Sequence, residues 1–171
     1  MPDQTSALPG SANLTAPSLY LSRELAALEF NFRVLAMARD AAVPLLERLR
    51  YLSIVANNLD EFFEVRVAML KHHHAYGSAA PGPDGISSGE LLARIRSRVL
   101  DLVAEQYAAW QEQISPQLDA ARIRILTRKH WSPRQRRWLQ GYFEHEVLPV
   151  LSPLGLDPAH PFPRILNKTL N

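Results

Sequence analysis

The stretch ANNLDEFFEVRVAML, residues 56–70, spaces its apolar side chains as a helix does and sets two asparagines before an acidic pair. Leu59 and Phe62 begin an apolar stripe that runs to the end of the stretch. Asparagine is a poor helix former but a good N-cap, and Glu61 stands three residues after Asn58 as in a capping box. The pattern predicts that one helix is interrupted at the asparagines and that another resumes after them.

The residues on either side of this stretch predict a helical hairpin supported by a first helix. The first helix is expected to begin after the N-cap Ser22, and the second opens at Pro44, a residue suited to a first helical turn. The segment 77–89 is rich in glycine and predicts a flexible connection. A long amphipathic helix then returns antiparallel until Pro116, which should kink or end it.

The pattern changes after residue 121, where IRIL (residues 123–126) alternates in the manner of a strand. Ser132 and Gln135 then predict a helix that opens with a capping box and has proline in its first turn. The buried face of that helix would consist of Trp138, Leu139, Tyr142, Phe143 and Val147. Because a strand and a helix need further strands to complete a sheet, residues 122–171 are predicted to be the truncated start of an α/β domain.

The predicted fold is therefore mainly α, in three parts. Residues 1–20 are expected to be a disordered tail, because Pro, Ser, Thr and Gly dominate them and offer little apolar surface. Residues 21–121 would form the helical amino-terminal domain, and residues 122–171 the incomplete beginning of a middle, or head, domain.

Composition limits the class of protein. A chain of 171 residues with 47% hydrophobic content can bury the core of one domain plus part of another. The absence of cysteine excludes a disulfide framework and thiolate metal sites. No segment approaches the roughly 20 consecutive apolar residues of a membrane span, and the first residues do not resemble a secretion signal. The expected protein is soluble and cytoplasmic, without a transmembrane segment.

Asn58 is the main candidate for a binding residue. Its amide offers a donor and an acceptor side by side, which can pair with the N6 and N7 edge of adenine. Simple capping of the predicted helix start explains the same residue equally well, so the pattern alone leaves both interpretations open.

Three further groups of polar residues are weaker candidates. His72–His74 are consecutive and point to different sides of a helix, which favours a solvated helix end over a metal site. Asp60 and Glu64 lie one helical turn apart, where a solvated or salt-bridged face is favoured over a shared cation. The stretch from Arg122 to Arg137 contains seven Lys or Arg residues and no acidic one, which indicates either a solvated basic face or a surface for an anion such as polyphosphate.

Two long motifs resemble sequences of a known family. SRELAALEFNFRVLAMARDAAVPLLERLRYLSIVANNLDEFFEVRVAML (residues 22–70) closely resembles the amino-terminal helical domain of the bacterial polyphosphate kinases. LGLDPAHPFPRILNKTLN (residues 154–171) resembles the start of the next domain of that family. The resemblance extends over nearly everything from Leu21 to Asn171.

The resemblance implies a function and one site. It implies that the asparagine before the L-D-E-F run, here Asn58, contacts the adenine end of ATP. Tyr51, which follows the E-R-L-R run, would either help to wall the base pocket or simply pack in the helix bundle. Asn57 is expected to be structural.

The implied chemistry lies outside these residues. ATP would give its terminal phosphate to a histidine, which passes it reversibly to the end of a polyphosphate chain in the presence of Mg²⁺. The phosphoacceptor histidine and the groups that hold Mg²⁺ would belong to domains that this chain does not contain, so no catalytic or metal residue is assigned here. The fragment alone is expected to be inactive, and the intact phosphoprotein to be a homo-oligomer that does not bind nucleic acid. The alternative is a non-enzymatic helical module that binds a polyanion or a partner protein.

The first helix departs from the family pattern. Where the family usually reads E-L-S-W-L, this chain has Ala26 and Ala27 in place of the serine and the tryptophan. The loss of an indole removes a large packing or contact surface. We expect this departure to leave the region around Asn58 intact.

Overall fold

The computed structural model describes residues 14–77, 81–159, 161–166 and 169. The chain divides into two compact units, Met1–Arg124 and Ile125–Asn171. Residues 1–13 of the predicted tail lie outside the described residues, whereas Pro17–Leu19 form a single 3-10 turn. In the described part of the chain, no helix is both long and apolar enough to cross a membrane.

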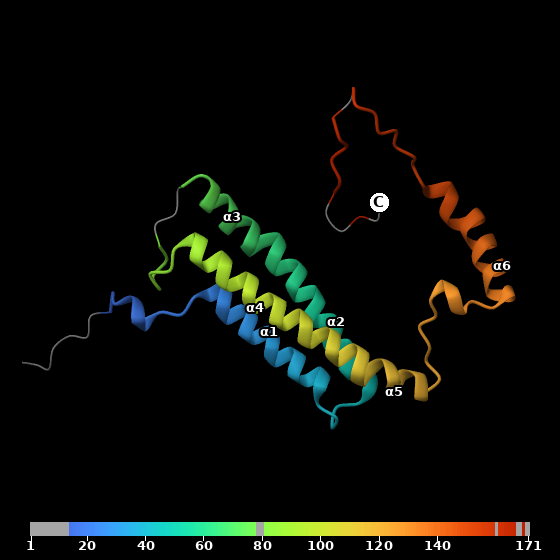
Figure 1. Cartoon of the computed structure of the whole chain (residues 1–171), viewed down its shortest axis with the longest axis horizontal. Coiled ribbons are helices and arrows are strands. Elements are labelled where there is room, and N and C mark those ends of the chain that lie inside the picture. Colours follow the sequence, from blue (N-terminus) through green and yellow to red (C-terminus); the bar gives the residue numbers. More distant parts are fainter. Residues whose placement is uncertain (1–13, 78–80, 160, 167–168, 170–171) are drawn as a thin grey trace, which may run out of the picture. The chain divides into compact units, whose positions relative to one another are not determined.

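The first unit is a bundle of three helical rods that lie side by side (Figure 1). The first rod is α1 (Arg23–Arg39). The second is α2 (Leu45–Glu61), which continues through a π segment into α3 (Ala68–Ala75), and the third is α4 (Ser88–Ala108), which continues through a second π segment into α5 (Ser115–Ala120). Connections between the rods reverse the chain, so consecutive rods run antiparallel and the first and third rods run parallel. The predicted helical hairpin with a supporting first helix is confirmed.

Serine caps fix two of the helix starts. The Ser22 hydroxyl oxygen accepts a hydrogen bond from the N–H of Leu25 at 3.3 Å, as predicted for the start of α1. The Ser87 hydroxyl oxygen accepts one from the N–H of Glu90, also at 3.3 Å. Helix α4 therefore begins inside the segment that was predicted to be a flexible connection.

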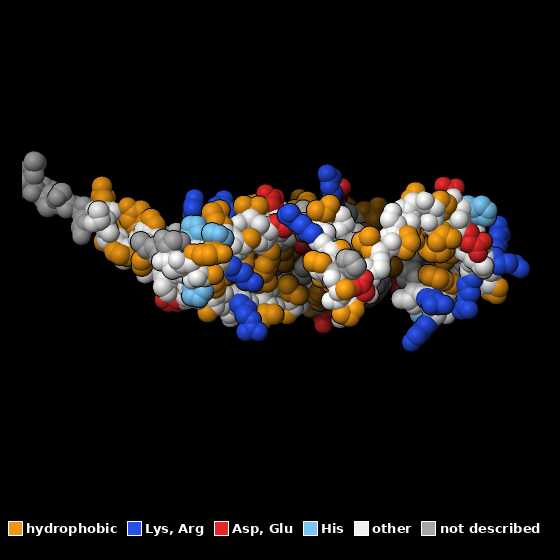
Figure 2. Space-filling model, turned by 90° about the horizontal axis from the view of Figure 1, so that it is seen from above, with side chains coloured by type: hydrophobic (Ala, Val, Ile, Leu, Met, Phe, Trp, Pro, Cys, Tyr) orange, Lys and Arg blue, Asp and Glu red, His pale blue; other side chains and the backbone are white. Residues whose placement is uncertain are grey.

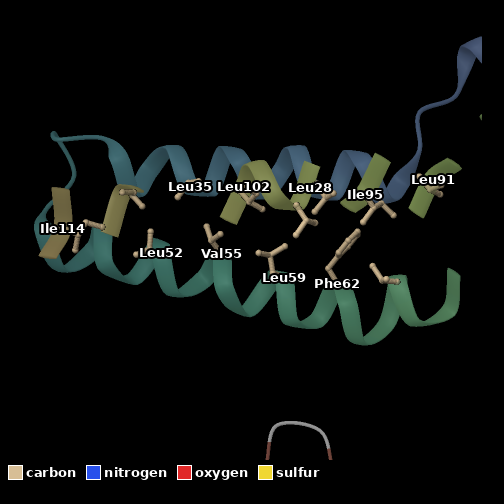
Figure 3. Close-up of a cluster of buried hydrophobic side chains, with 14 of the residues drawn as sticks. Leu28, Leu35, Leu52, Val55, Leu59, Phe62, Leu91, Ile95, Leu102 and Ile114 are labelled. Atoms are coloured by element: carbon tan, nitrogen blue, oxygen red, sulfur yellow. The ribbon is translucent and has the colours of Figure 1, made fainter. Parts of the chain in front are cut away.

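An apolar core fills the space between the three rods. Leu28 and Leu35 from α1, Val55 from α2 and Leu102 from α4 are each at most 1% exposed. Figure 3 shows these side chains pointing toward one another from the three rods. Burying a side chain of this size contributes about 1.5–3 kcal/mol, so this core is the main source of the stability of the first unit.

A buried arginine ties the three rods together at one end. Arg48 is 3% exposed, and its Nε donates to the carbonyl oxygen of Ala38 at 2.8 Å. Its Nη2 and Nη1 donate to the amide oxygens of Gln113 at 2.9 Å and Gln117 at 3.1 Å. A buried guanidinium requires such partners, because an unpaired charge in the interior is strongly unfavourable. Arg48 thus joins α1 and α2 to the end of the third rod.

A surface ion pair joins the first and third rods. Arg98 donates to both carboxylate oxygens of Glu29, at 2.5 and 2.9 Å, and its guanidinium carbon lies 3.6 Å from the centre of the Phe32 ring. The hydrogen bond from Arg98 lowers the pKa of Glu29 below its ordinary value. The same bond raises the pKa of the Arg98 guanidinium.

The second rod does not stop at the two asparagines. Helix α2 runs without a break through Asn57 and Asn58 to Glu61 and passes into the π segment Phe62–Val67. The predicted N-cap at Asn58 is therefore wrong. Asn58 has helical backbone neighbours on both sides, and its side chain bonds across to α1 and does not cap a helix start.

The third rod does not end at Pro116. The π segment Ala109–Ile114 precedes it, and α5 continues to Ala120 with the proline in its first turn. A widened turn changes which carbonyl groups lie below the proline ring, so the clash and the missing N–H of a proline are more easily accommodated there. The predicted kink or end at this residue is replaced by the π segment before it.

The third rod ends in a left-handed turn. Arg122 has φ of 63°, and the N–H of Ile123 donates to the carbonyl of Leu118 at 2.9 Å. The N–H of Arg122 donates to the carbonyl of Asp119 at 3.0 Å, which completes a Schellman motif. The motif satisfies two carbonyl groups that the helix end would otherwise leave without a partner.

The second unit contains one main helix, α6 (Pro133–Tyr142), which continues as a π segment (Phe143–Val147) and a 3-10 turn (Leu148–Val150). A further 3-10 turn, Arg128–His130, precedes it. The predicted capping box is confirmed: the Ser132 hydroxyl oxygen accepts from the N–H of Gln135, and the Gln135 side chain accepts from the N–H of Ser132. The start of α6 is therefore set by local sequence.

Two predictions for the second unit are wrong. Residues 123–126 form no strand, and no strand occurs anywhere among the residues that the structure describes. An extended segment needs the N–H and C=O groups of a neighbouring strand, and these residues have none beside them. The expected face of α6 is not buried: Trp138, Tyr142 and Phe143 are exposed, and Leu139 and Val147 are only partly buried. Trp138 is 65% exposed and stacks on Tyr142 with ring centres 5.4 Å apart. The described part of this unit buries no residue, so the apolar side of α6 has no partner there.

Candidate functional site

An open groove of about 300 Å³ lies between α1 and the end of α2, where the second rod passes into its π segment. Apolar side chains of Phe30 and Val65 line it beside the amides of Asn31 and Asn58. Concave sites with apolar walls and a few fixed polar groups are typical of small-molecule binding. The groove is therefore the candidate site of the first unit.

Asn58 is held in this groove by a chain of two hydrogen bonds. Its side-chain Nδ2 donates to Oδ1 of Asn31 at 3.1 Å, and Nδ2 of Asn31 donates to the carbonyl oxygen of Val55 at 3.2 Å. Asn31 is buried, with 3% of its surface exposed, whereas Asn58 is half-buried at the groove wall. The side-chain oxygen Oδ1 of Asn58 and the second N–H of its Nδ2 remain for a ligand.

The exposure of the two neighbouring asparagines separates their roles. Asn57 is exposed and does not line the groove, while Asn58 does. Successive residues of a helix point about 100° apart, so only one of the pair can face α1. The helical periodicity therefore places the side chain of Asn58 at the groove and leaves that of Asn57 exposed to solvent.

One of the two residues that depart from the family pattern, Ala27, lies at the same groove. Ala27 lines it together with Asn58. The exchange at this position therefore bears directly on the groove, and the expectation that it leaves the surroundings of Asn58 intact stays a prediction. A tryptophan at position 27 would extend from this wall, and the alanine leaves the groove open at that place.

Tyr51 takes the second of its two predicted roles. It is partly buried and packs against the core cluster, and it does not line the groove. It precedes Asn58 by nearly two helical turns, which carries its side chain along the bundle axis and away from the amide.

Sequence reasoning missed two residues of the site. Asn31 lies in the quoted family motif without an assigned role, and Arg66 lies in the opening stretch. Arg66 lines the groove and also a second cavity of about 410 Å³, whose walls include Arg23, Glu24 and His73. No signal in the sequence pairs Asn31 with Asn58, because the two residues are 27 positions apart. The position of Arg66 follows from the π segment, which moves Val67 to the buried face.

The three consecutive histidines lie at the end of α3. The ring of His72 packs 4.5 Å from that of Tyr76, and Nδ1 of His74 is 3.2 Å from the Ser88 hydroxyl. Within the described ranges, no three His, Asp or Glu side chains come together as a metal site would require. Asp60 and Glu64 are both exposed on the second rod.

Every Lys and Arg side chain of the basic stretch is exposed. Within the second unit, Arg134, Arg136 and Arg137 belong to the first turns of α6, and none of them forms an ion pair with a described residue. Figure 2 shows Lys and Arg side chains gathered on the surface of this unit. Cations at a helix N-terminus are disfavoured by the helix dipole unless an anion neutralises them.

Comparisons with known proteins identify both units. A sequence model of the Polyphosphate kinase N-terminal domain matches residues 20–126, and one of the Polyphosphate kinase middle domain matches residues 134–171. A polyphosphate kinase of Xylella fastidiosa is 54% identical over 155 residues, which cover 91% of this chain and 22% of that protein. One of Pseudomonas putida is 46% identical over 167 residues, which cover 98% of this chain and 23% of that protein.

A solved structure agrees with these sequence matches. The crystal structure of polyphosphate kinase from Porphyromonas gingivalis matches with a TM-score of 0.68 at 30% identity, over 85% of this chain and 20% of that one. The chain thus spans about a fifth of the length of the relatives that it matches. The domain matches, the sequence identities and the shared fold lead to one conclusion: the chain belongs to the polyphosphate kinase family.

Proposed function

We propose that this chain supplies one wall of the ATP site in an enzyme that reversibly transfers the terminal phosphate of ATP to polyphosphate. In this proposal Asn58 contacts the adenine end of the nucleotide. The phosphohistidine that carries the phosphate, and the groups that hold Mg²⁺, belong to parts of a homo-oligomeric enzyme outside this chain. Bound Mg²⁺ would neutralise charge on the phosphates during transfer.

The observation that carries the proposal is the fixed amide of Asn58 at the wall of an apolar groove. A purine base needs a flat apolar surface for its ring and a donor–acceptor pair for its edge. Phe30 and Val65 supply apolar surface, and the unpaired oxygen and N–H of Asn58 supply the polar pair. We assign the phosphate chemistry to other parts of the enzyme, since the chain spans only about a fifth of the relatives that it matches.

Replacement of Asn58 by alanine in the full-length protein that carries this sequence tests the proposal. We expect Asn58→Ala to raise the KM for ATP about tenfold, the factor for a lost pair of hydrogen bonds to a base. The helical content measured by circular dichroism should stay that of the wild type, because Asn58 caps no helix. Asn57→Ala is the matched control, since Asn57 is exposed on the same turn and does not line the groove; its KM should not change.

An unchanged KM for ATP in Asn58→Ala would contradict the proposal. The rival function, a non-enzymatic helical module that binds a polyanion, is favoured by the unpaired arginines at the start of α6. If the intact protein lacked ATP-dependent phosphate transfer and still bound polyphosphate with a steep dependence on salt, this second function would replace the first.

A further inference from the structure

The buried amide of Asn31 bonds to two neighbours, one through its nitrogen and one through its oxygen. Its Nδ2 donates to the carbonyl oxygen of Val55 and its Oδ1 accepts from Nδ2 of Asn58, at 3.2 and 3.1 Å. Asn31 lines the groove, but only 3% of its surface is exposed, so its second N–H is poorly accessible to a ligand. We therefore expect its role to lie in the bonds to its two partners.

The two hydrogen bonds that link Val55, Asn31 and Asn58 allow only one assignment of donors and acceptors. A backbone carbonyl can only accept, so the atom of Asn31 that faces Val55 must be the nitrogen. The oxygen of Asn31 then faces Asn58, and the atom of Asn58 that meets it must be a nitrogen as well. The orientation of the Asn58 amide, which a half-buried asparagine could otherwise reverse, is thus fixed from the backbone of α2.

We propose that Asn31 is a positioning residue that holds the amide of Asn58 in one orientation and thereby makes the groove prefer adenine to guanine. This inference rests on the proposed function. With its nitrogen turned to Asn31, Asn58 offers its oxygen and its remaining N–H to the base. Adenine presents a donor beside an acceptor on its N6 and N7 edge, whereas guanine presents two acceptors, O6 and N7. A fixed donor–acceptor pair matches the first edge and repels one atom of the second.

A purely structural role would have different consequences. If Asn31 served only to fill space between α1 and α2, its loss would affect all nucleotides alike, through the stability of the bundle. If it acts through Asn58, its loss frees that amide to reverse, and the preference between bases falls. The ratio of the affinities for ATP and GTP therefore separates the two roles.

A double-mutant cycle in the full-length protein that carries this sequence tests the proposal, with ATP and GTP as probes. Asn31→Leu keeps a side chain of similar size and removes both hydrogen bonds. We expect it to lower the preference for ATP over GTP about fivefold, the factor for a neutral hydrogen bond. In the Asn58→Ala background the same change should have no further effect. Leu35→Val is the control, because Leu35 is a buried α1 residue away from the groove and its change should lower stability without altering the ratio.

The cycle also distinguishes failure of this inference from failure of the proposed function. An equal loss of ATP preference from Asn31→Leu in both backgrounds, or no loss in either, would overturn the positioning role while a raised KM in Asn58→Ala upheld the proposed function. A wild-type KM in Asn58→Ala would overturn both.

Asn31→Asp provides a second measurement that does not depend on how well Asn31→Leu folds. A carboxyl group, protonated or not, has an oxygen that can accept from Nδ2 of Asn58, so it should hold that amide in the same orientation. We therefore expect Asn31→Asp to keep a preference for ATP over GTP close to that of the wild type, in contrast to Asn31→Leu. A loss of preference in Asn31→Asp as large as in Asn31→Leu would overturn the proposal.

Discussion

Arg48 is the one charged side chain among the described residues that is almost wholly buried, and the acceptors of its hydrogen bonds are neutral oxygens. No carboxylate compensates its charge, so the carbonyl of Ala38 and the amides of Gln113 and Gln117 do so together. Hydrogen bonds to a charged group contribute more than neutral ones, about 1.5–3 kcal/mol each, but desolvation of the guanidinium opposes them. The net contribution of Arg48 depends on all three rods being in place.

We expect Arg48→Ala to lower the free energy of unfolding by about 3 kcal/mol, because it removes three hydrogen bonds and leaves a cavity. Arg50→Ala is the matched control two residues away. Arg50 is exposed and forms only a 3.8 Å pair with Glu47, so its loss should change the free energy by less than about 0.5 kcal/mol. Urea denaturation of both variants checks the prediction. Equal effects of the two changes would show that the buried bonds of Arg48 add nothing net.

At the residue scale, hydrogen bonds between residues close in sequence could be predicted, and hydrogen bonds between residues far apart in sequence could not. The caps at Ser22 and Ser132 were predicted because their hydrogen bonds reach only three residues along the chain. For Asn58 the sequence left capping open as one of two interpretations, because its actual partner, Asn31, is 27 positions away. A residue that can satisfy itself locally or across the bundle gives the same local sequence pattern in both cases.

At the scale of helices, the two long rods share one feature, a five-residue step in their buried positions. Phe62 and Val67 are both buried, and so are Ala109 and Ile114. In a regular α-helix two residues five apart point about 140° away from each other. A π segment at each step takes up the extra residue and keeps both on the core side. The step of five was visible in the sequence, but the interruption was attributed to asparagine and proline because their low helix propensity was given too much weight against packing.

We expect deletion of Glu112 to convert the second π segment to regular α-helix, because it shortens the step from Ala109 to Ile114 to four. The free energy of unfolding should change by less than about 1 kcal/mol, since the core keeps its register. Deletion of Arg96 is the control. It removes an equally exposed residue from a regular part of α4 and turns all that follows by about 100°.

The control deletion should lower the free energy of unfolding by more than about 3 kcal/mol, because it moves buried leucine and isoleucine side chains out of the core. Thermal denaturation followed by circular dichroism compares the two deletions. If deletion of Glu112 were as damaging as deletion of Arg96, the π segment would be required by the fold and would not merely absorb one residue.

At the scale of the whole chain, burial is unevenly divided. Every residue of the core cluster belongs to the unit Met1–Arg124, and the described part of Ile125–Asn171 has none. Hydrophobic burial is the main term that offsets the loss of chain entropy on folding. The helical domain could be predicted because its apolar periodicity is satisfied within the first unit. The conformation of IRIL and the exposure of the apolar side of α6 could not be predicted, because no core forms around them in the described part of the chain.

We expect residues 1–124, expressed alone, to fold into a stable helical bundle with a single cooperative thermal transition. Residues 125–171 alone should show a gradual loss of helical signal without a transition, because α6 is short and isolated helices of its length are marginal in water. Circular dichroism melts of the two fragments check this. A cooperative transition in the second fragment would mean that it has a core which the described residues do not reveal.

The widened turn at Phe62–Val67 shows how a surface can change while an interior stays the same. An extra residue inserted into a helix would usually rotate all following residues relative to the neighbouring helices. Here the π segment takes up the extra residue within one turn. Val67 keeps its place in the interior, and Arg66 stands beside the groove. Lineages that differ by one residue between these positions would therefore share an interior and differ in the charge presented to a ligand. Chain length, as well as side-chain identity, is then a variable on which selection for a binding site can act.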